Sequence, residues 1–116
     1  MKKEKFKVID FIREFIIYVD SYMDNFPRKD IEIKNRIRNT SYDLLEIAYR
    51  ANQTKENKEK YIDQIVVKVK LLDFLLNLCY DKQIINNKRY VKFGEKLDDI
   101  LKFSAGWKNS LKQNRA

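Results

Sequence analysis

Three lysines near the carboxyl end of the chain recur at every fourth position, at Lys88, Lys92 and Lys96. This spacing places side chains in a row along one side of a helix, with Arg89 at the edge of the row. Because each lysine that contacts a phosphate releases condensed counterions, the row could bind a phosphodiester backbone. Residues 86–116 carry eight basic and three acidic side chains, so they hold +5 of the chain's net charge of +8. A solvated helix face has the same pattern, so charge alone leaves both interpretations open.

A second basic group lies within residues 28–57, which carry seven basic and five acidic side chains. Here Lys34 and Arg38 share one side of the predicted helix with Tyr42 and Tyr49. Tyr and Arg side chains can stack on exposed bases. The predicted phosphate contacts come from both groups: Arg28, Lys29, Arg36, Arg38, Arg50, Lys88, Arg89, Lys92 and Lys96.

The residue types that most catalytic sites use are missing. The chain has no His and a single Cys, Cys79, which excludes Ser–His and Cys–His nucleophile pairs and His-containing metal sites. A lone thiol cannot form an internal disulfide and is typical of a reducing compartment. Di-metal helix bundles use a Glu-x-x-His motif, so we interpret Glu46, Asp63, Asp73 and Asp98 as solvated carboxylates. We therefore predict no enzymatic activity, no metal and no cofactor.

The composition is that of one small helical domain. The chain has 116 residues, 44% of them hydrophobic, with two Gly and one Pro. A sheet protein of this size would need many more turn residues. No apolar run approaches the roughly 18 residues of a membrane span, and Asp10, Arg13 and Glu14 interrupt any apolar stretch behind the basic N-terminus. These features predict a cytoplasmic protein without membrane contact and a single domain over residues 1–116.

Apolar residues recur at steps of three and four in four segments, which predicts helices over about residues 4–25, 28–52, 58–82 and 87–112. Phe26–Pro27 predicts the end of the first helix, because the residue before a proline avoids helical angles. The candidate N-caps of the third and fourth helices are Thr54 or Asn57 and Asn86 or Asn87. Short connections favour antiparallel neighbours, so the predicted fold is an all-α, up-down-up-down four-helix bundle.

The third helix is the most apolar, since Leu71, Phe74, Leu75 and Leu78 widen its predicted core stripe. Cys79 continues that stripe as a small core residue. Trp107 continues the stripe of the fourth helix, but its small neighbours could also make it a contact between subunits. The candidate residues for a subunit interface are Tyr18, Tyr22 and Trp107.

The order of these features resembles the accessory variability determinant (Avd) proteins of diversity-generating retroelements. That family has a Phe-Pro dipeptide before its second helix, a Leu-rich third helix and a terminal Gly-Gly-Trp. The matching segments here are FPRKDIEIKNRIRNTSYDLLEIAYRAN and YIDQIVVKVKLLDFLLNLCYDKQIINNKRYVKFGEKLDDILKFSAGWKNSL. The similarity spans about residues 20–112. Ala105 stands in place of the first glycine, and Asn77 stands where a basic residue is expected.

The resemblance implies a four-helix bundle that assembles as a homopentameric barrel with a basic surface. It implies binding of RNA and/or DNA and of the element's reverse transcriptase, in a non-catalytic role in mutagenic reverse transcription (mutagenic retrohoming). Two alternatives stay open. One is a four-helix bundle of the type encoded by intervening sequences in ribosomal RNA genes, and the other is a purely structural oligomer that binds proteins.

Overall fold

The computed structural model describes the backbone of residues 2–113 and the side chains of residues 7–113, and this part of the chain contains four α-helices and no strand. They are α1 (Lys2–Tyr22), α2 (Ile31–Gln53), α3 (Lys58–Asp81) and α4 (Asn87–Gln113). A short 3-10 turn, η1 (Arg28–Asp30), precedes α2. The predicted domain also includes Met1 and residues 114–116, which lie outside the described residues.

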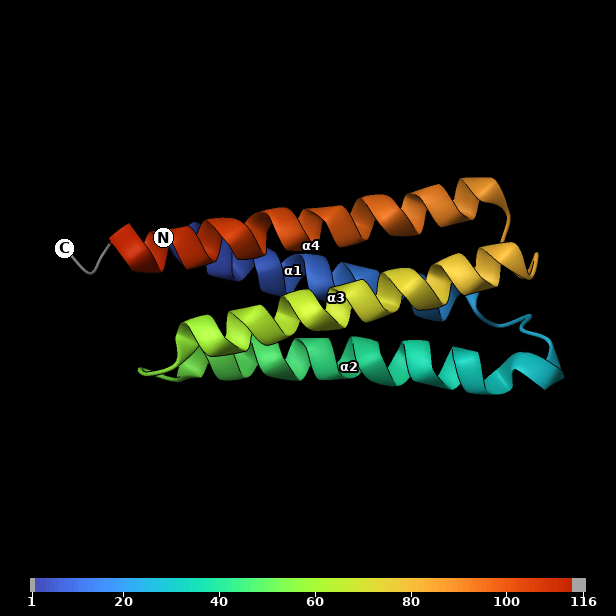
Figure 1. The fold of residues 1–116 in the computed structure, drawn as a ribbon, viewed down its shortest axis with the longest axis horizontal. Coiled ribbons are helices and arrows are strands. Elements are labelled where there is room, and N and C mark those ends of the chain that lie inside the picture. The colour runs from blue at the N-terminus through green and yellow to red at the C-terminus, as the bar shows by residue number, and fades with distance from the viewer. Residues whose placement is uncertain (1, 114–116) are drawn as a thin grey trace.

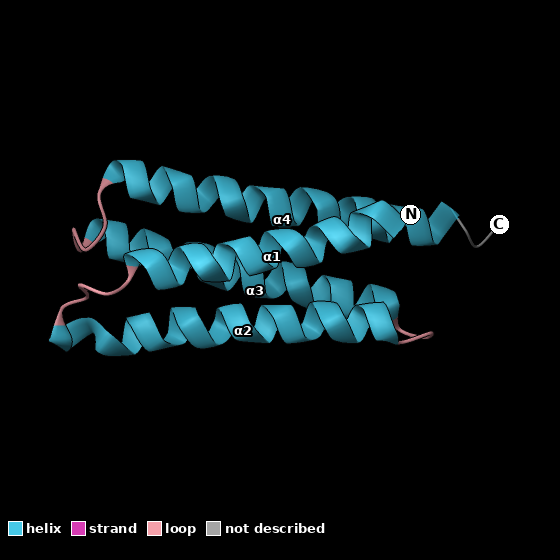
Figure 2. Cartoon of the chain, turned by 180° about the vertical axis from the view of Figure 1, so that it is seen from behind, coloured by secondary structure: helices cyan, strands magenta, loops and turns pink. Residues whose placement is uncertain are grey.

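The four helices surround one core in an elongated bundle of 51 × 22 × 19 Å. The neighbouring pairs are α1–α2, α2–α3, α3–α4 and α4–α1. Loops 23–27 and 82–86 lie at one end of the bundle, and loop 54–57 lies at the other (Figure 1). The view from behind has the same arrangement, with α1 in front of α3 and with α2 and α4 on either side (Figure 2).

The helix boundaries differ from the sequence prediction mainly around Pro27. α1 ends at Tyr22 because Asp24 and Asn25 form a turn; their side chains compete for backbone hydrogen bonds and favour turns over helix. After Pro27 the chain first makes η1, in which the backbone nitrogen of Asp30 donates to the carbonyl of Pro27 at 3.0 Å. The carboxylate of Asp30 is buried and lies 3.3 Å from Lys82 Nζ, so an ion pair fastens the start of α2 to the end of α3.

Asn57 and Asn86 precede the last two helices and start them in different ways. Asn57 adopts a left-handed φ of 64° without a capping hydrogen bond from its side chain, a conformation that Asn tolerates better than most residues. Asn86 caps α4, because its Oδ1 accepts a hydrogen bond from the backbone nitrogen of Arg89 at 2.8 Å. Thr54 is the C-cap of α2 and does not cap α3, and its hydroxyl donates to the carbonyl of Glu56 at 2.7 Å.

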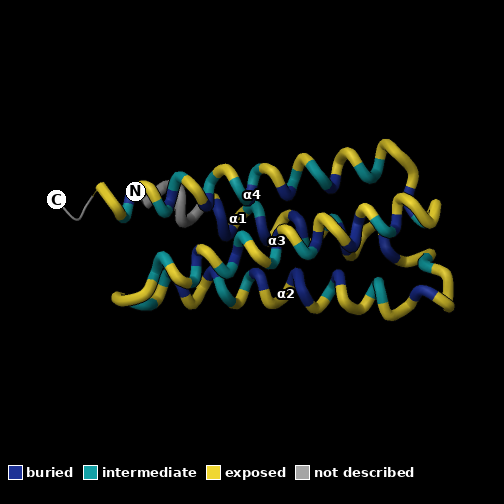
Figure 3. Tube along the Cα trace, in the orientation of Figure 1, coloured by how far each residue is buried: buried dark blue, intermediate teal, exposed yellow. Residues whose placement is uncertain are grey.

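The inner faces of all four helices form a single apolar core (Figure 3). The spacing of three and four located this face correctly on α2 and α4, where Ile37, Leu44 and Phe93 are fully buried. Phe15 of α1 meets Phe93 of α4 edge-on, with ring centroids 6.0 Å apart. Cys79 is also fully buried, as predicted.

The outward side of α3 departs from the sequence prediction. Phe74 is 61% exposed and Val67 is 65% exposed, although Phe74 was expected to widen the core. The core side of α3 is already filled by other apolar residues, so Phe74 projects from the opposite side of the helix. Steps of four, three and four join these residues with the partly buried Leu71 and Leu78. We call Val67, Leu71, Phe74 and Leu78 the outer face of α3.

Candidate nucleic-acid interface

A cluster of cations and aromatic rings joins α1 to α4. Arg89 of α4 donates from Nη1 to the hydroxyl oxygen of Tyr18 of α1, at 2.7 Å. The guanidinium carbon of Arg89 also lies 3.4 Å from the ring centroid of Tyr22. Lys96 extends over the ring of Tyr18, with Nζ 5.0 Å from its centroid. These distances are those of cation–π contacts, which fix the cations on the aromatic surface.

Helical spacing on two neighbouring helices explains why these residues meet. Tyr18 and Tyr22 are four residues apart on the side of α1 that faces α4, and their ring centroids are 4.6 Å apart. Arg89 and Lys96 are seven residues apart, which is about two turns of α4. The hydrogen bond to Tyr18 is the main reason why the pKa of Arg89 lies above its ordinary value. The cluster therefore carries a fixed positive charge over two tyrosine rings.

Lys88 and Lys92 extend this cluster along α4. Both side chains are exposed, and within residues 7–113 neither makes an ion pair. Unpaired lysines beside a positive cluster are suited to anionic partners, because no carboxylate must first be displaced. We call Tyr18, Tyr22, Lys88, Arg89, Lys92 and Lys96 the α1/α4 basic surface.

The basic residues of the second group are more scattered. Arg38 lies 3.5 Å from the carboxylate of Asp20, and its pKa is raised first by a hydrogen bond with Tyr42 and then by the charge of Asp20. Arg50 is paired with Glu46 within α2, at 3.0 Å. The exposed Arg36 lies on α2, and Arg28 and Lys29 lie on η1. The structure thus gathers four of the nine predicted phosphate contacts on the α1/α4 basic surface and leaves the other five elsewhere.

The predicted subunit-interface residues separate into two environments. Tyr18 and Tyr22 lie on the α1/α4 basic surface, in contact with Arg89, so two sequence predictions concern the same surface. Trp107 is 2% exposed and belongs to the core of the bundle. Its core interpretation is therefore correct, and its side chain has almost no surface left for a contact with a second subunit.

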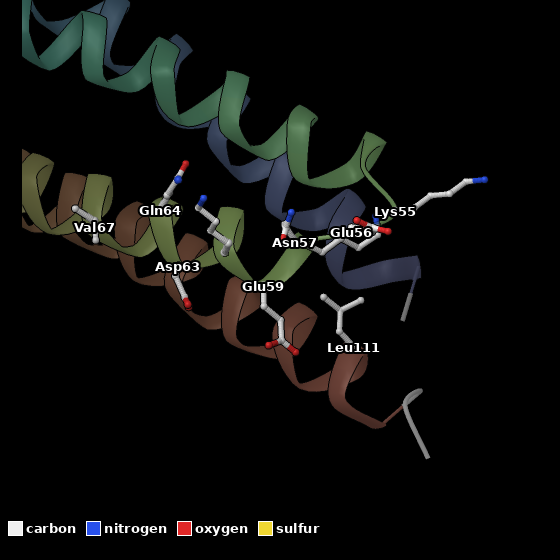
Figure 4. Close-up of a pocket in the computed structure, with 10 residues that line it drawn as sticks. Lys55, Glu56, Asn57, Glu59, Asp63, Gln64, Val67 and Leu111 are labelled. Atoms are coloured by element: carbon white, nitrogen blue, oxygen red, sulfur yellow. The ribbon is translucent and has the colours of Figure 1, made fainter.

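The end of the bundle that holds loop 54–57 has a hollow of about 920 Å³ (Figure 4). Its charged groups are mixed in sign and several are already engaged. Lys58 Nζ donates to the carbonyls of Ala51 and Asn52 at 2.9 and 3.3 Å, and Lys108 Nζ donates to Asp63 at 2.7 Å. The hydrogen bond to Asp63 is the main cause that raises the pKa of Lys108. This hollow is an open surface lined by groups of both charges.

The described residues contain neither a candidate metal cluster nor a candidate membrane span. Among them, no group of three or more His, Cys, Asp and Glu side chains is placed to hold a metal ion. Within the same part of the chain, none of the helices has the length and apolar character that crossing a membrane requires.

Comparison with known proteins identifies the family. Residues 3–111 match the family described as bAvd-like. The chain belongs to the bAvd-like family. The match includes the Phe26–Pro27 dipeptide and the Trp107 segment, so the resemblance read from the sequence is confirmed over nearly the whole chain. Searches of curated proteins and of solved structures gave no match.

In this bAvd-like chain, sequence reasoning found the cations but missed their partners. Arg89 was predicted to contact phosphate, and Tyr18 and Tyr22 were predicted to contact a second subunit. The structure places all three in one cluster, across a sequence separation of 71 residues between Tyr18 and Arg89. The available signal was a tyrosine pair spaced by four on one helix and a basic row on a helix that packs beside it.

Proposed function

We propose that this bAvd-like protein is a non-enzymatic accessory protein of a diversity-generating retroelement. In this role it binds RNA and/or DNA and associates with the element's reverse transcriptase during mutagenic reverse transcription. The observation that carries the nucleic-acid part is the α1/α4 basic surface. There, Lys88 and Lys92, which make no ion pair within residues 7–113, extend a cluster in which Arg89 and Lys96 lie on tyrosine rings. Membership of the bAvd-like family supports the reverse-transcriptase part.

The salt dependence of binding tests the nucleic-acid part. Contacts to phosphates release counterions, so the logarithm of the association constant should fall linearly with the logarithm of the salt concentration. A protein with six to ten phosphate contacts loses about 10³- to 10⁵-fold in affinity between about 50 and 200 mM salt. Fluorescence anisotropy with labelled RNA and DNA measures this loss. Affinity that does not change with salt, or no binding at low salt, would contradict the proposal.

The genes beside this one test the reverse-transcriptase part directly. A diversity-generating retroelement requires a neighbouring reverse-transcriptase gene and a pair of near-identical repeats. If both are present, the two proteins should co-purify after co-expression, and nuclease treatment should leave the complex intact. Loss of the complex on nuclease treatment would mean that nucleic acid alone joins the two proteins.

We also propose that the bundle has the antiparallel, up-down-up-down order and assembles as a homopentamer. The positions of the loops in Figure 1 support the antiparallel order. The outer face of α3 supports association with protein, because Val67 and Phe74 expose large apolar side chains on the side of the helix away from the core. Sedimentation velocity tests the assembly, and a monomer at micromolar concentration would contradict it.

The exposed outer face of α3 also favours a second candidate function, a purely structural oligomer that binds other proteins. This candidate predicts a stable protein complex and no affinity for nucleic acid at low salt. The anisotropy measurement therefore separates the two functions, since they differ on whether the α1/α4 basic surface binds phosphate.

A further inference from the structure

A hollow of about 310 Å³ lies where the end of α1 meets loop 82–86, beside the α1/α4 basic surface. Its volume is close to the lower limit of roughly 300 Å³ for small-ligand pockets. The lining residues come from two segments that are far apart in the sequence: Ser21, Tyr22, Asp24, Asn25, Ile84, Ile85, Asn86 and Arg89. We call it the end hollow.

One side of the end hollow is a stacked pair of flat groups. Tyr22 is 46% exposed, and the guanidinium of Arg89 lies 3.4 Å from its ring centroid. The hydrogen bond from Arg89 to Tyr18 keeps the guanidinium in place. Tyrosine rings and Arg guanidinium planes are the side-chain groups on which unpaired bases stack. The pair is already assembled without a ligand, so little side-chain ordering would be needed on binding.

The rest of the lining combines apolar and hydrogen-bonding groups. Ile84 and Ile85 supply apolar surface. Asn86 Oδ1 is occupied by the backbone nitrogen of Arg89, which leaves the Asn86 amide NH₂ available as a donor. Ser21 Oγ donates to the carbonyl of Ile17 at 2.9 Å, which leaves its oxygen available as an acceptor. A nucleobase has flat apolar faces and hydrogen-bonding edges, so it matches a hollow that offers both apolar surface and hydrogen-bond donors and acceptors.

The charges around the end hollow favour a base over a phosphate as its ligand. Asp24 is one of the lining residues, and its negative charge would repel a phosphate, whereas a carboxylate can accept hydrogen bonds from the amino groups of bases. The unpaired cations Lys88 and Lys92 lie on α4 next to Arg89 and one turn beyond it. Phosphates on either side of a bound base would therefore meet lysines, while the base itself meets Tyr22.

We propose that the end hollow binds one unpaired nucleobase of a single-stranded nucleic acid, stacked on the uncovered side of the Tyr22–Arg89 pair. This inference rests on the proposed nucleic-acid function and adds a preference for single strands. A duplex cannot use the site, because a paired base is not free to turn out and stack on a side chain.

The test compares strands that have the same phosphates but differ in their bases. Anisotropy is measured with a 12-nucleotide single strand and with the same strand made entirely of abasic nucleotides. Stacking of one base on an aromatic side chain corresponds to roughly 5- to 150-fold in affinity. The wild-type protein should bind the abasic strand more weakly than the normal strand by a factor in this range. A duplex of the same sequence carries twice the phosphates, so its affinity is compared only between wild type and Tyr22→Ala, and it should not change.

Variants of Tyr22 test whether the preference for strands with bases arises at the end hollow. Tyr22→Ala should weaken binding of the normal strand by about fivefold or more and remove the difference between normal and abasic strands. Tyr22→Phe keeps the ring and should bind within about twofold of wild type. Tyr80→Ala is the matched control, because Tyr80 is 37% exposed, stacks on Tyr90 and does not line the hollow, and this variant should bind as wild type. A strand with 5-iodouracil should crosslink to Tyr22 on irradiation.

Asn25→Leu gives an independent test if Tyr22→Ala does not fold. Asn25 lines the end hollow within the turn after α1. A leucine there has nearly the same shape but removes the amide that can hydrogen-bond to a base edge, while leaving Tyr22 and Arg89 unchanged. The variant should also lose the preference for normal over abasic strands.

The outcomes separate this inference from the function on which it rests. If wild type binds abasic and normal strands equally, or if Tyr22→Ala and Asn25→Leu keep the preference, the inference is wrong. The proposed function survives that result when binding is still salt-dependent. If no strand binds at low salt, both are wrong.

Discussion

The two outward surfaces of the bundle use aromatic and apolar side chains in opposite ways. On the α1/α4 basic surface, Tyr18 and Tyr22 are each in contact with a cation. On the outer face of α3, Phe74 and Val67 project into solvent, and within residues 7–113 no cation–π contact involves Phe74. Aromatic side chains with bound cations are suited to nucleic acid, whereas a bare apolar stripe is suited to another protein. The comparison supports the proposal that nucleic acid and protein bind on separate faces of the bundle.

The strongest effect on binding is expected from reversing the charge of the α1/α4 basic surface. Replacing Lys88, Lys92 and Lys96 together by Glu should abolish nucleic-acid binding at moderate salt, because three attractions to phosphate become repulsions. A matched control is the replacement of Lys55, Lys60 and Lys70 by Glu. These lysines are also exposed, away from the α1/α4 surface, and the control changes the net charge equally.

Anisotropy measures the affinity of both triple variants, and circular dichroism measures their helix content. The control should lose affinity only modestly. Equal losses in the two variants would mean that net charge, and not the α1/α4 basic surface, determines binding.

A second variant tests whether the outer face of α3 binds protein. Val67→Lys combined with Phe74→Lys should weaken self-association or reverse-transcriptase binding by tenfold or more, because it places charges in the centre of an apolar contact. Both side chains are more than 60% exposed, so the stability of the single chain should change by about 0.5 kcal/mol or less per site. Sedimentation velocity and co-purification measure the association. A variant that still assembles and still co-purifies would exclude this face as a protein contact.

The core faces of α2, α3 and α4 could be predicted from the sequence, but the width of the core face of α3 could not. On α2, residues such as Ile37 and Leu44 concentrate on one side, so a spacing of three and four identifies the core. α3 has two apolar stripes on opposite sides, one through Leu72 and one through Phe74. Periodicity places Leu72 on the core stripe but cannot say that the second stripe stays exposed.

The candidate site was only half predictable for a related reason. The lysine row follows from local spacing, since all of its members are on one helix. The contact between Arg89 and Tyr18 depends on which helices are neighbours, and the end hollow depends on how two loops meet. Pairwise packing of this kind cannot be derived from the local pattern of one sequence.

The reactivity of the Cys79 thiol shows whether a variant changes one face locally or unfolds the bundle. Burial is the main cause that raises the pKa of its thiol to about 11, from an ordinary value of 9.0. At pH 8 the folded protein should therefore react with maleimide at least about 100-fold more slowly than the unfolded chain, because the thiolate is the reactive form. Variants on either outward face should keep this protection, and a variant that loses it has lost the core as well.

The same thiol predicts a dependence of stability on pH. The pKa is higher in the folded state, so the unfolded state ionises first as the pH rises through 9. The contribution of Cys79 to the free energy of unfolding is therefore fully present below about pH 9 and is lost between about pH 9 and 11. Urea denaturation of wild type and Cys79→Ala across this range measures the loss, and identical pH profiles would contradict the assignment.

A substitution in α4 should stabilise the bundle slightly without changing either outward face. Gly94 lies within α4, and apart from its two chain neighbours and the adjacent backbone of the helix no heavy atom lies within 4 Å of where a Cβ would stand. Gly94→Ala should stabilise the protein by about 1 kcal/mol, because alanine is the better helix former and nothing obstructs its methyl group. Chemical denaturation measures the gain. Binding to nucleic acid and to protein should be unchanged, so the two surfaces can be compared at higher stability.

The position of the end hollow has a geometric consequence for an assembly. Loops 23–27 and 82–86 place it at one tip of a bundle 51 Å long. In a closed ring, rotation carries equivalent points of all subunits to the same height along the axis. If the bundles stand along that axis, every hollow lies on the same rim. A flexible strand passing around that rim could place successive bases in successive subunits, and such multivalent binding would exceed the affinity of any one site.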